Sequence, residues 1–104
     1  MPTYQAPLRD IAFVAHELLN LGNHYPQLVD CEALDSTTFD AIVEEGAKFA
    51  EQQLAPLNAI GDTHGCRLHE GKVTTPPGFA AAFSAFASNG WLGLDKDPTY
   101  GGQG

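Results

Sequence analysis

Apolar residues recur at helical spacing along the stretch "PLRDIAFVAHELLNL", which runs from Pro7 to Leu21. A stripe with a period near 3.6 residues predicts an amphipathic helix. Pro7 suits the first turn of this helix, and Gly22 suits its end. The positions that share the apolar face are Leu8, Ile11, Val14, Ala15, Leu18 and Leu21.

The stretch "STTFDAIVEEGAKFAEQQLAP" shows the same period most clearly and predicts a second helix that ends at Pro56. Thr37 and Asp40 have the spacing of a capping box, although the acid replaces the usual Glu or Gln. Glu44 and Lys48 stand four residues apart in the favourable order, which predicts a surface ion pair. The apolar face carries Phe39, Ile42, Val43, Ala47, Phe49, Ala50 and Leu54.

The chain between Pro56 and Pro77 has no long period and is predicted to be a loop. Within it, "CRLHEGKVTT" alternates weakly, which indicates a short hairpin around Glu70-Gly71.

A third helix is predicted in "TPPGFAAAFSAFASNGW". Thr75 is a plausible cap, Pro76 a plausible first-turn residue, and Asn89-Gly90 a helix stop. The predicted fold class is therefore all-α, with about three main helices and one irregular loop. The apolar stripe of this helix contains Phe79, Ala82, Phe83, Phe86 and Ala87.

Composition and charge narrow the function classes. The chain has 104 residues, 43% of them hydrophobic, which fits one globular domain. Thirteen acidic and five basic residues give a formal charge of −8. Such a chain repels phosphate backbones and anionic membrane surfaces, so nucleic acid is not an expected partner.

The two cysteines, Cys31 and Cys66, have no C-x-x-C spacing. We interpret them as reduced thiols of a cytoplasmic protein, with a disulfide between them as the alternative. The N-terminus has no basic segment followed by a long apolar run, as a secretory signal would. No stretch approaches the roughly 18 apolar residues of a membrane span.

One cluster of potential metal ligands stands out: His64, Cys66 and His69, with Asp62 and Glu70 beside them. Zinc needs four well-placed donors, and the spacing H-x-C-x-x-H matches no strong metal signature. We therefore predict a polar loop and no metal site.

Two further patterns could indicate chemistry. His16 and Glu17 are adjacent on a helix, where neighbours point about 100° apart, so they do not form an acid–base pair. The segment "GGQG" resembles a phosphate loop only weakly, because no strand precedes it and no helix follows it. We predict no catalytic, cofactor-binding or metal residue from composition and spacing.

Three stretches in order resemble the beginning of the acyl-CoA dehydrogenase family. They are "EEGAKFAEQQLAPLNAIGDTHGCRL", "VTTPPGFAAAFSAFASNGWLGL" and "DPTYGGQG". The opening "YQAPLRDIAFVAHELLNL" resembles the extra N-terminal segment of a larger-subunit branch of that family. The resemblance divides the chain into an N-terminal helical extension at residues 1–30 and a truncated start of the family's N-terminal helical domain at residues 31–104.

The resemblance implies a parent enzyme of fatty acid metabolism, an FAD-containing flavoprotein and oxidoreductase. Such enzymes oxidise the Cα–Cβ bond of an acyl-CoA thioester to the 2-enoyl-CoA and pass electrons to an electron-transferring flavoprotein. In the family the catalytic glutamate and the flavin contacts lie outside this region, so the chain alone is expected to be an inactive fragment without FAD. Tyr100, Gly101 and Gly102 are expected in a loop towards the substrate pocket.

The alternative to an enzyme fragment is a stand-alone helical module for protein interaction. Three Phe and one Trp within thirteen residues are more apolar surface than three helices readily cover. We therefore expect the chain to self-associate through exposed apolar helices.

Overall fold

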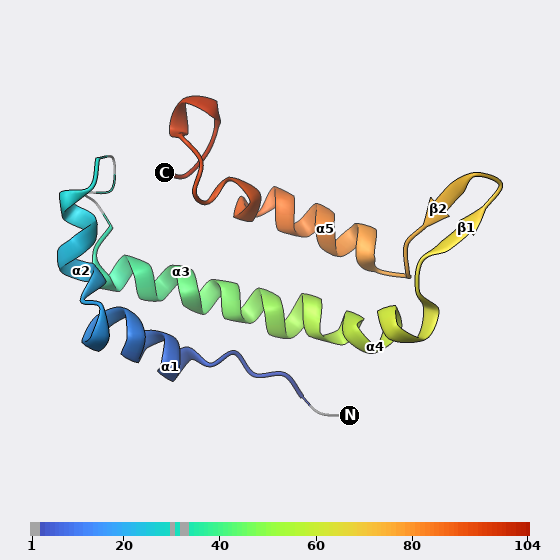
Figure 1. Cartoon of the computed structure of the whole chain (residues 1–104), viewed down its shortest axis with the longest axis horizontal. Coiled ribbons are helices and arrows are strands. Elements are labelled where there is room, and N and C mark those ends of the chain that lie inside the picture. Colours follow the sequence, from blue (N-terminus) through green and yellow to red (C-terminus); the bar gives the residue numbers. More distant parts are fainter. Residues whose placement is uncertain (1–2, 30, 32–33) are drawn as a thin grey trace. The chain divides into compact units, whose positions relative to one another are not determined.

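The computed structural model describes residues 3–29, 31 and 34–104 and is mostly helical (Figure 1). This confirms the predicted all-α class, to which the structure adds one two-stranded hairpin. The chain divides into two compact units, Met1–Glu51 and Gln52–Gly104. This division is distinct from the boundary at residue 30 that the family resemblance implies.

The first unit begins with α1 (Leu8–Ala12), which continues as a π-helical segment, Phe13–Leu18. Pro7 lies at the N-cap, one position before the first turn in which it was predicted, and Gly22 does not end the helix. The helix stops at Leu19, and Asn20 makes the turn with φ of 50°, because Asn tolerates the left-handed conformation. The short helix α2 (Leu21–His24) and the 3₁₀ turn Tyr25–Gln27 follow.

Gly22 lies inside α2 and allows a close approach instead of ending a helix. A Cβ placed there would stand 2.5 Å from Oγ of Ser36, the first residue of α3 (Ser36–Phe49). The glycine is thus explained by contact with a neighbouring element, which a helix-stop rule does not consider.

Helices α1 and α3 lie side by side (Figure 1). Ala15, in the π-helical continuation of α1, and Ala47, in α3, are the buried apolar side chains among the described residues of this unit. The predicted apolar face of the first helix is only partly buried, since Leu18 is 67% exposed. The π-helical segment bonds five residues back, Leu19 N–H to Val14 O, which rotates later side chains away from their α-helical positions.

Two polar contacts tie the first helix and the residue before its N-cap to α3 and the residues after it. Nε2–H of His16 donates to Asp40 Oδ1 over 2.5 Å, since an ionised carboxylate only accepts. The backbone N–H of Ala6 donates to Glu51 Oε1 over 2.8 Å. Asp40 therefore has a partner in the tertiary structure and takes no part in a capping box.

The N-cap of α3 is Asp35, so the prediction of Thr37 was wrong. Asp35 Oδ1 accepts from the N–H of Thr38 at 2.7 Å, and this bond to the charged form lowers the pKa of Asp35 below 3.8. The predicted ion pair between Glu44 and Lys48 is also replaced by another. Lys48 Nζ donates to Glu45 Oε1, three residues earlier in the same helix, over 2.8 Å. In both cases the observed residue lies one or two positions from the predicted one. How far each side chain reaches decides which residue makes the contact.

In the second unit, α4 (Ala55–His64) occupies part of the predicted loop. Pro56 does not end a helix but lies in the first turn of α4. The proline has no N–H to donate to a carbonyl of the preceding turn, and the change from π-helical to α-helical bonding lies just before it. The preceding residues, Ala50–Leu54, are π-helical, so no loop residue precedes the proline.

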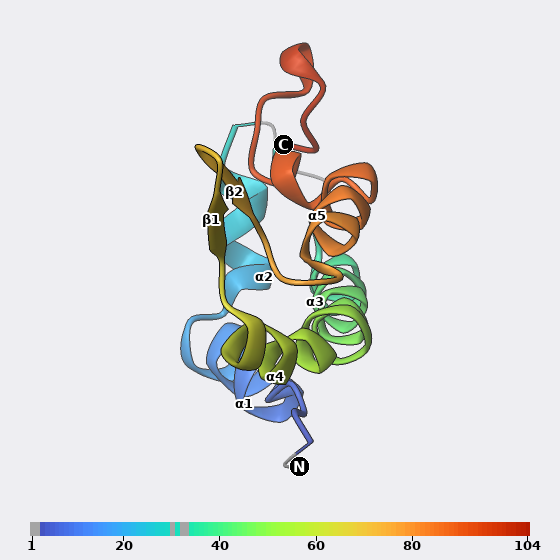
Figure 2. The ribbon, with the colours of Figure 1, turned by 90° about the vertical axis from the view of Figure 1, so that its right-hand side faces the viewer.

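The predicted hairpin is present. Strands β1 (Arg67–His69) and β2 (Lys72–Thr74) pair antiparallel, with Leu68 opposite Val73. Glu70 and Gly71 both have positive φ, 50° and 76°, as a two-residue type I′ turn requires. The hairpin stands off from the helices of its unit in both views (Figures 1 and 2).

Helix α5 (Phe79–Ser88) begins later than predicted. Its N-cap is Gly78 with φ of 87°, and neither Thr75 nor Pro76 belongs to it. Its end agrees with the prediction, because Asn89 caps it and Gly90 turns with φ of 87°. The 3₁₀ turns Trp91–Gly93 and Pro98–Tyr100 complete the unit.

Among the described residues, the buried apolar side chains are small: Ala15, Ala47, Ala82 and Pro76. In that same part of the chain, no helix has the length and apolar character needed to cross a bilayer.

Candidate functional site

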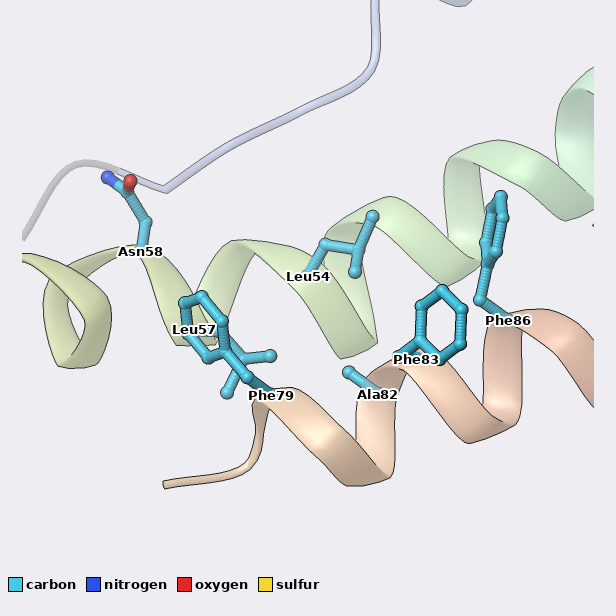
Figure 3. Close-up of a pocket in the computed structure, with 7 residues that line it drawn as sticks. All are labelled: Leu54, Leu57, Asn58, Phe79, Ala82, Phe83 and Phe86. Atoms are coloured by element: carbon cyan, nitrogen blue, oxygen red, sulfur yellow. The ribbon is translucent and has the colours of Figure 1, made fainter. Parts of the chain in front are cut away.

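An apolar groove of about 360 Å³ lies in the second unit (Figure 3). Its walls come from two sides, Leu54 and helix α4 on one and helix α5 on the other. The lining residues are Leu54, Leu57, Asn58, Phe79, Ala82, Phe83 and Phe86. Figure 3 shows the α5 side chains directed towards the opposite wall. The groove is therefore built from the aromatic stripe that the sequence pattern singled out.

Two glycines set how closely the walls approach. A Cβ at Gly61 would lie 2.7 Å from the ring of Phe79, so that ring rests against the backbone of α4. A Cβ at Gly78 would lie 2.8 Å from Cδ2 of Leu57. These contacts seat the first turn of α5 on α4 and fix one end of the groove.

The chemistry of the groove is that of an apolar contact surface. Asn58 is the polar residue among those that line it, and none of the lining residues is charged. Phe83 is 62% exposed and Leu54 is 44% exposed, so large apolar surface faces outward. Such a lining favours apolar side chains or chains of methylene groups over ions.

The glycine-rich segment forms a closed loop. Gly101 N–H donates to Pro98 O and Gly102 N–H to Asp97 O, at 3.0 and 3.1 Å. Gln103 N–H donates to Gly93 O, and Gly104 N–H donates to Lys96 O, each at 2.8 Å. Because these N–H groups donate within the loop, they are not directed at a phosphate, and the phosphate-loop interpretation fails for this conformation.

Backbone conformation explains why this loop contains glycine. Gly101 has φ of 89°, which favours glycine. A Cβ at Gly102 would lie 2.1 Å from the carbonyl oxygen of Lys96, a clash with backbone. Asp97 caps the 3₁₀ turn by accepting from Thr99 N–H at 2.8 Å, and that bond lowers the pKa of Asp97 below 3.8.

Tyr100, which the sequence places with Gly101 and Gly102 near a substrate pocket, is 87% exposed on this loop. None of the three lines the groove. The loop and the groove are thus two separate features of the second unit.

The other candidate residues are placed as follows. His16 contacts Asp40, and not Glu17, and its ring meets Phe39 edge-on with centroids 5.7 Å apart. Its Nδ1 is buried and has no hydrogen-bond partner among the described residues. In the described part of the chain, no group of three His, Cys, Asp or Glu side chains could hold a metal ion; His64, Cys66 and His69 form none.

Comparison with known proteins decides the relationship. No protein-family model matches the chain. The 3-methylmercaptopropionyl-CoA dehydrogenase of Ruegeria pomeroyi is 37% identical over an alignment of 105 positions that covers 98% of this chain. The chain is related to the acyl-CoA dehydrogenases. The match confirms the family resemblance drawn from the sequence.

The chain spans only 17% of the length of the Ruegeria pomeroyi dehydrogenase. The apolar pattern of the sequence predicts the aromatic side of the groove, but Leu57 and Asn58 fall in the stretch predicted to be a loop. A signal was available in "LAPLNAIGD", where Leu54, Leu57 and Gly61 recur at helical spacing across the proline.

Proposed function

We propose that this chain supplies the start of the N-terminal helical region of an FAD-dependent acyl-CoA dehydrogenase. The parent enzyme would oxidise the Cα–Cβ bond of an acyl-CoA thioester to the 2-enoyl-CoA, with an electron-transferring flavoprotein as electron acceptor. The identity of 37% to a dehydrogenase of this kind, over 98% of the chain, is the observation that carries the proposal.

The described residues do not themselves fit FAD. A flavin dinucleotide needs donors or positive charge for its pyrophosphate. The amides of the glycine-rich loop are engaged within the loop, and the groove lining carries no charge. In the proposal, the flavin and the catalytic base therefore belong to other parts of the parent enzyme.

The role proposed for this chain is to form part of the wall of the substrate pocket, with the loop of Tyr100, Gly101 and Gly102 directed towards it. The closed hydrogen bonding of the loop supports this role, because it presents an 87% exposed Tyr100 on a fixed backbone. A preorganised backbone lowers the conformational entropy lost when the side chain it carries binds.

The test is made on the natural protein that carries this sequence, purified from its source. We expect flavin absorbance and reduction of an electron acceptor by acyl-CoA thioesters, among them 3-methylmercaptopropionyl-CoA. Substituting Tyr100→Ala should raise KM for the thioester about 5-fold with little change in kcat, as expected for loss of one aromatic contact.

Tyr4→Ala, at an exposed tyrosine of the first unit, is the matched control and should leave KM unchanged. A colourless natural protein without dehydrogenase activity would overturn the enzyme proposal. An unchanged KM in Tyr100→Ala, with activity intact, would overturn only the role of the loop.

A second candidate function is a stand-alone helical module of the cytoplasm that binds protein and self-associates. The specific observation in its favour is helix α5, "FAAAFSAFAS", which contains no charged residue and carries the exposed Phe83. The exposed thiol of Cys66 is consistent with a reducing compartment.

A further inference from the structure

Helix α5 has no charged face. Eight of its ten residues are Ala or Phe, and the other two are Ser. The hydroxyl of Ser88 donates to the carbonyl oxygen of Ser84 at 2.8 Å, so its hydrogen bond is made within the helix and does not require water. A helix that is apolar all round normally lies in the core of a large protein or in a membrane, and ten residues are too few to cross a bilayer. The composition of α5 therefore indicates a core helix.

The described residues nevertheless leave several sides of α5 open. Phe79 and Phe83 are exposed on the groove side (Figure 3). Ala80 and Ala81 are also exposed, and at about 100° per residue they point to other sides of the helix than Phe79 does. Ala82 is the residue of α5 that is buried. Apolar surface is thus open both over the groove and away from it.

The relative indicates how much polypeptide is available to cover this helix. The chain spans 17% of the length of that dehydrogenase, so most of a parent protein of that size lies outside these residues. Segments joined to α5 by the same backbone meet it at a higher effective concentration than a separate molecule does. A two-fold contact with a second copy would bury one patch, whereas the open apolar surface lies on several sides of α5. These observations favour the rest of the same protein over a second copy.

We propose that the groove and the open sides of α5 are covered, in the parent protein, by apolar segments of the same polypeptide that lie outside residues 1–104. This inference rests on the proposed function, because it requires a parent protein longer than these residues. The groove determines the chemistry of the covering segment. Its lining carries no charge, so an apolar side chain fits against Leu54 and Phe83, whereas a charged one would lose its hydration without gaining a partner.

The experiment is photo-crosslinking of the natural protein, with p-benzoylphenylalanine in place of Phe83. We expect a crosslink within one polypeptide, which keeps the mass of one chain on a denaturing gel, to a peptide from outside residues 1–104. A crosslink that doubles the mass would assign the groove to a second copy and overturn the proposal. A crosslink confined to residues 1–104 would overturn it as well, since these residues would then cover their own groove.

Thiol accessibility tests the same point without a crosslinker. Phe83 is 62% exposed in these residues alone, so an uncovered Phe83→Cys would react with a maleimide nearly as fast in the native protein as in urea. We expect the native protein to react about 100-fold more slowly or less, because a covered position reacts only after local opening. Mass spectrometry of the peptide that carries position 83 measures this rate separately from those of Cys31 and Cys66.

Leu68→Cys is the matched control, because Leu68 is 74% exposed on the hairpin between two polar residues, Arg67 and His69. It should react at nearly the rate found in urea. Fast reaction of native Phe83→Cys with no crosslink from position 83, or equal protection of both variants, would overturn the proposal.

The outcomes separate this inference from the enzyme proposal. A natural protein of only 11.1 kDa would overturn the inference, because no further segment would exist to cover α5. A longer, colourless protein in which α5 is covered would overturn only the enzyme proposal. A flavin-containing dehydrogenase in which position 83 stays open would overturn only the inference.

Discussion

At the residue scale, Asp35 controls the start of α3 through a single hydrogen bond to Thr38 N–H. That bond lowers the pKa of Asp35 below 3.8. A group with a lowered pKa in the folded state contributes stability above its unfolded pKa. This contribution is lost as the pH falls through the lowered value, so the cap should weaken only below about pH 3.8.

We predict that Asp35→Ala reduces helicity and stability at pH 7, whereas Thr37→Ala at the position favoured by sequence leaves the cap intact. Asp35→Asn should keep a capping oxygen but remove the acid dependence of this site. Far-ultraviolet circular dichroism between pH 7 and pH 2 measures all three variants. Equal losses in Asp35→Ala and Thr37→Ala would contradict the assignment of the cap.

His16 and Asp40 illustrate why candidate chemistry at this scale needs the tertiary structure. The two residues are 24 apart in sequence, yet their side chains meet at 2.5 Å. The neighbour of His16 in sequence, Glu17, lies on a different side of the helix. The hydrogen bond to Asp40 therefore links the first helix to α3 through the side chain of His16.

At the element scale, the loop after α5 depends on Gly102. A Cβ there would overlap the carbonyl oxygen of Lys96 at 2.1 Å, and backbone cannot move as a side chain does. We predict that Gly102→Ala opens the loop at a cost of about 1–3 kcal/mol. Hydrogen exchange should show faster exchange of the amide protons of Gly102 and Gln103.

The control for this loop is Gly93→Ala. A Cβ at Gly93 would lie 3.5 Å from Cα of Gly102, which is ordinary contact. In Gly93→Ala, the amide protons of Gly102 and Gln103 should exchange at nearly the rate found in the unsubstituted chain. Slow exchange retained in Gly102→Ala would show that the loop tolerates a side chain at this position.

At the scale of the whole molecule, little area is buried, and the buried apolar side chains among the described residues are small, three alanines and Pro76. The slope of the unfolding free energy with denaturant follows the area exposed on unfolding. We predict a urea m-value below about 1 kcal/mol/M for the dilute chain. The transition midpoint should rise with protein concentration, because association stabilises the folded form.

Phe83→Glu serves as control, since its midpoint should not depend on concentration. Circular dichroism in urea at two concentrations measures both variants. An m-value of about 2 kcal/mol/M or more, together with a midpoint independent of concentration, would indicate a self-sufficient monomer.

The sequence by itself determined the helical class, the three apolar stripes, the hairpin at Glu70-Gly71 and the family relationship. These follow from local periodicity, turn chemistry and ordered motifs, all of which act between neighbours along the chain. Only the tertiary structure decided the cap at Asp35, the helical environment of Pro56, and the close approach of Gly102 to Lys96. Those features depend on which groups meet in space, and short-range rules carry no information about such contacts.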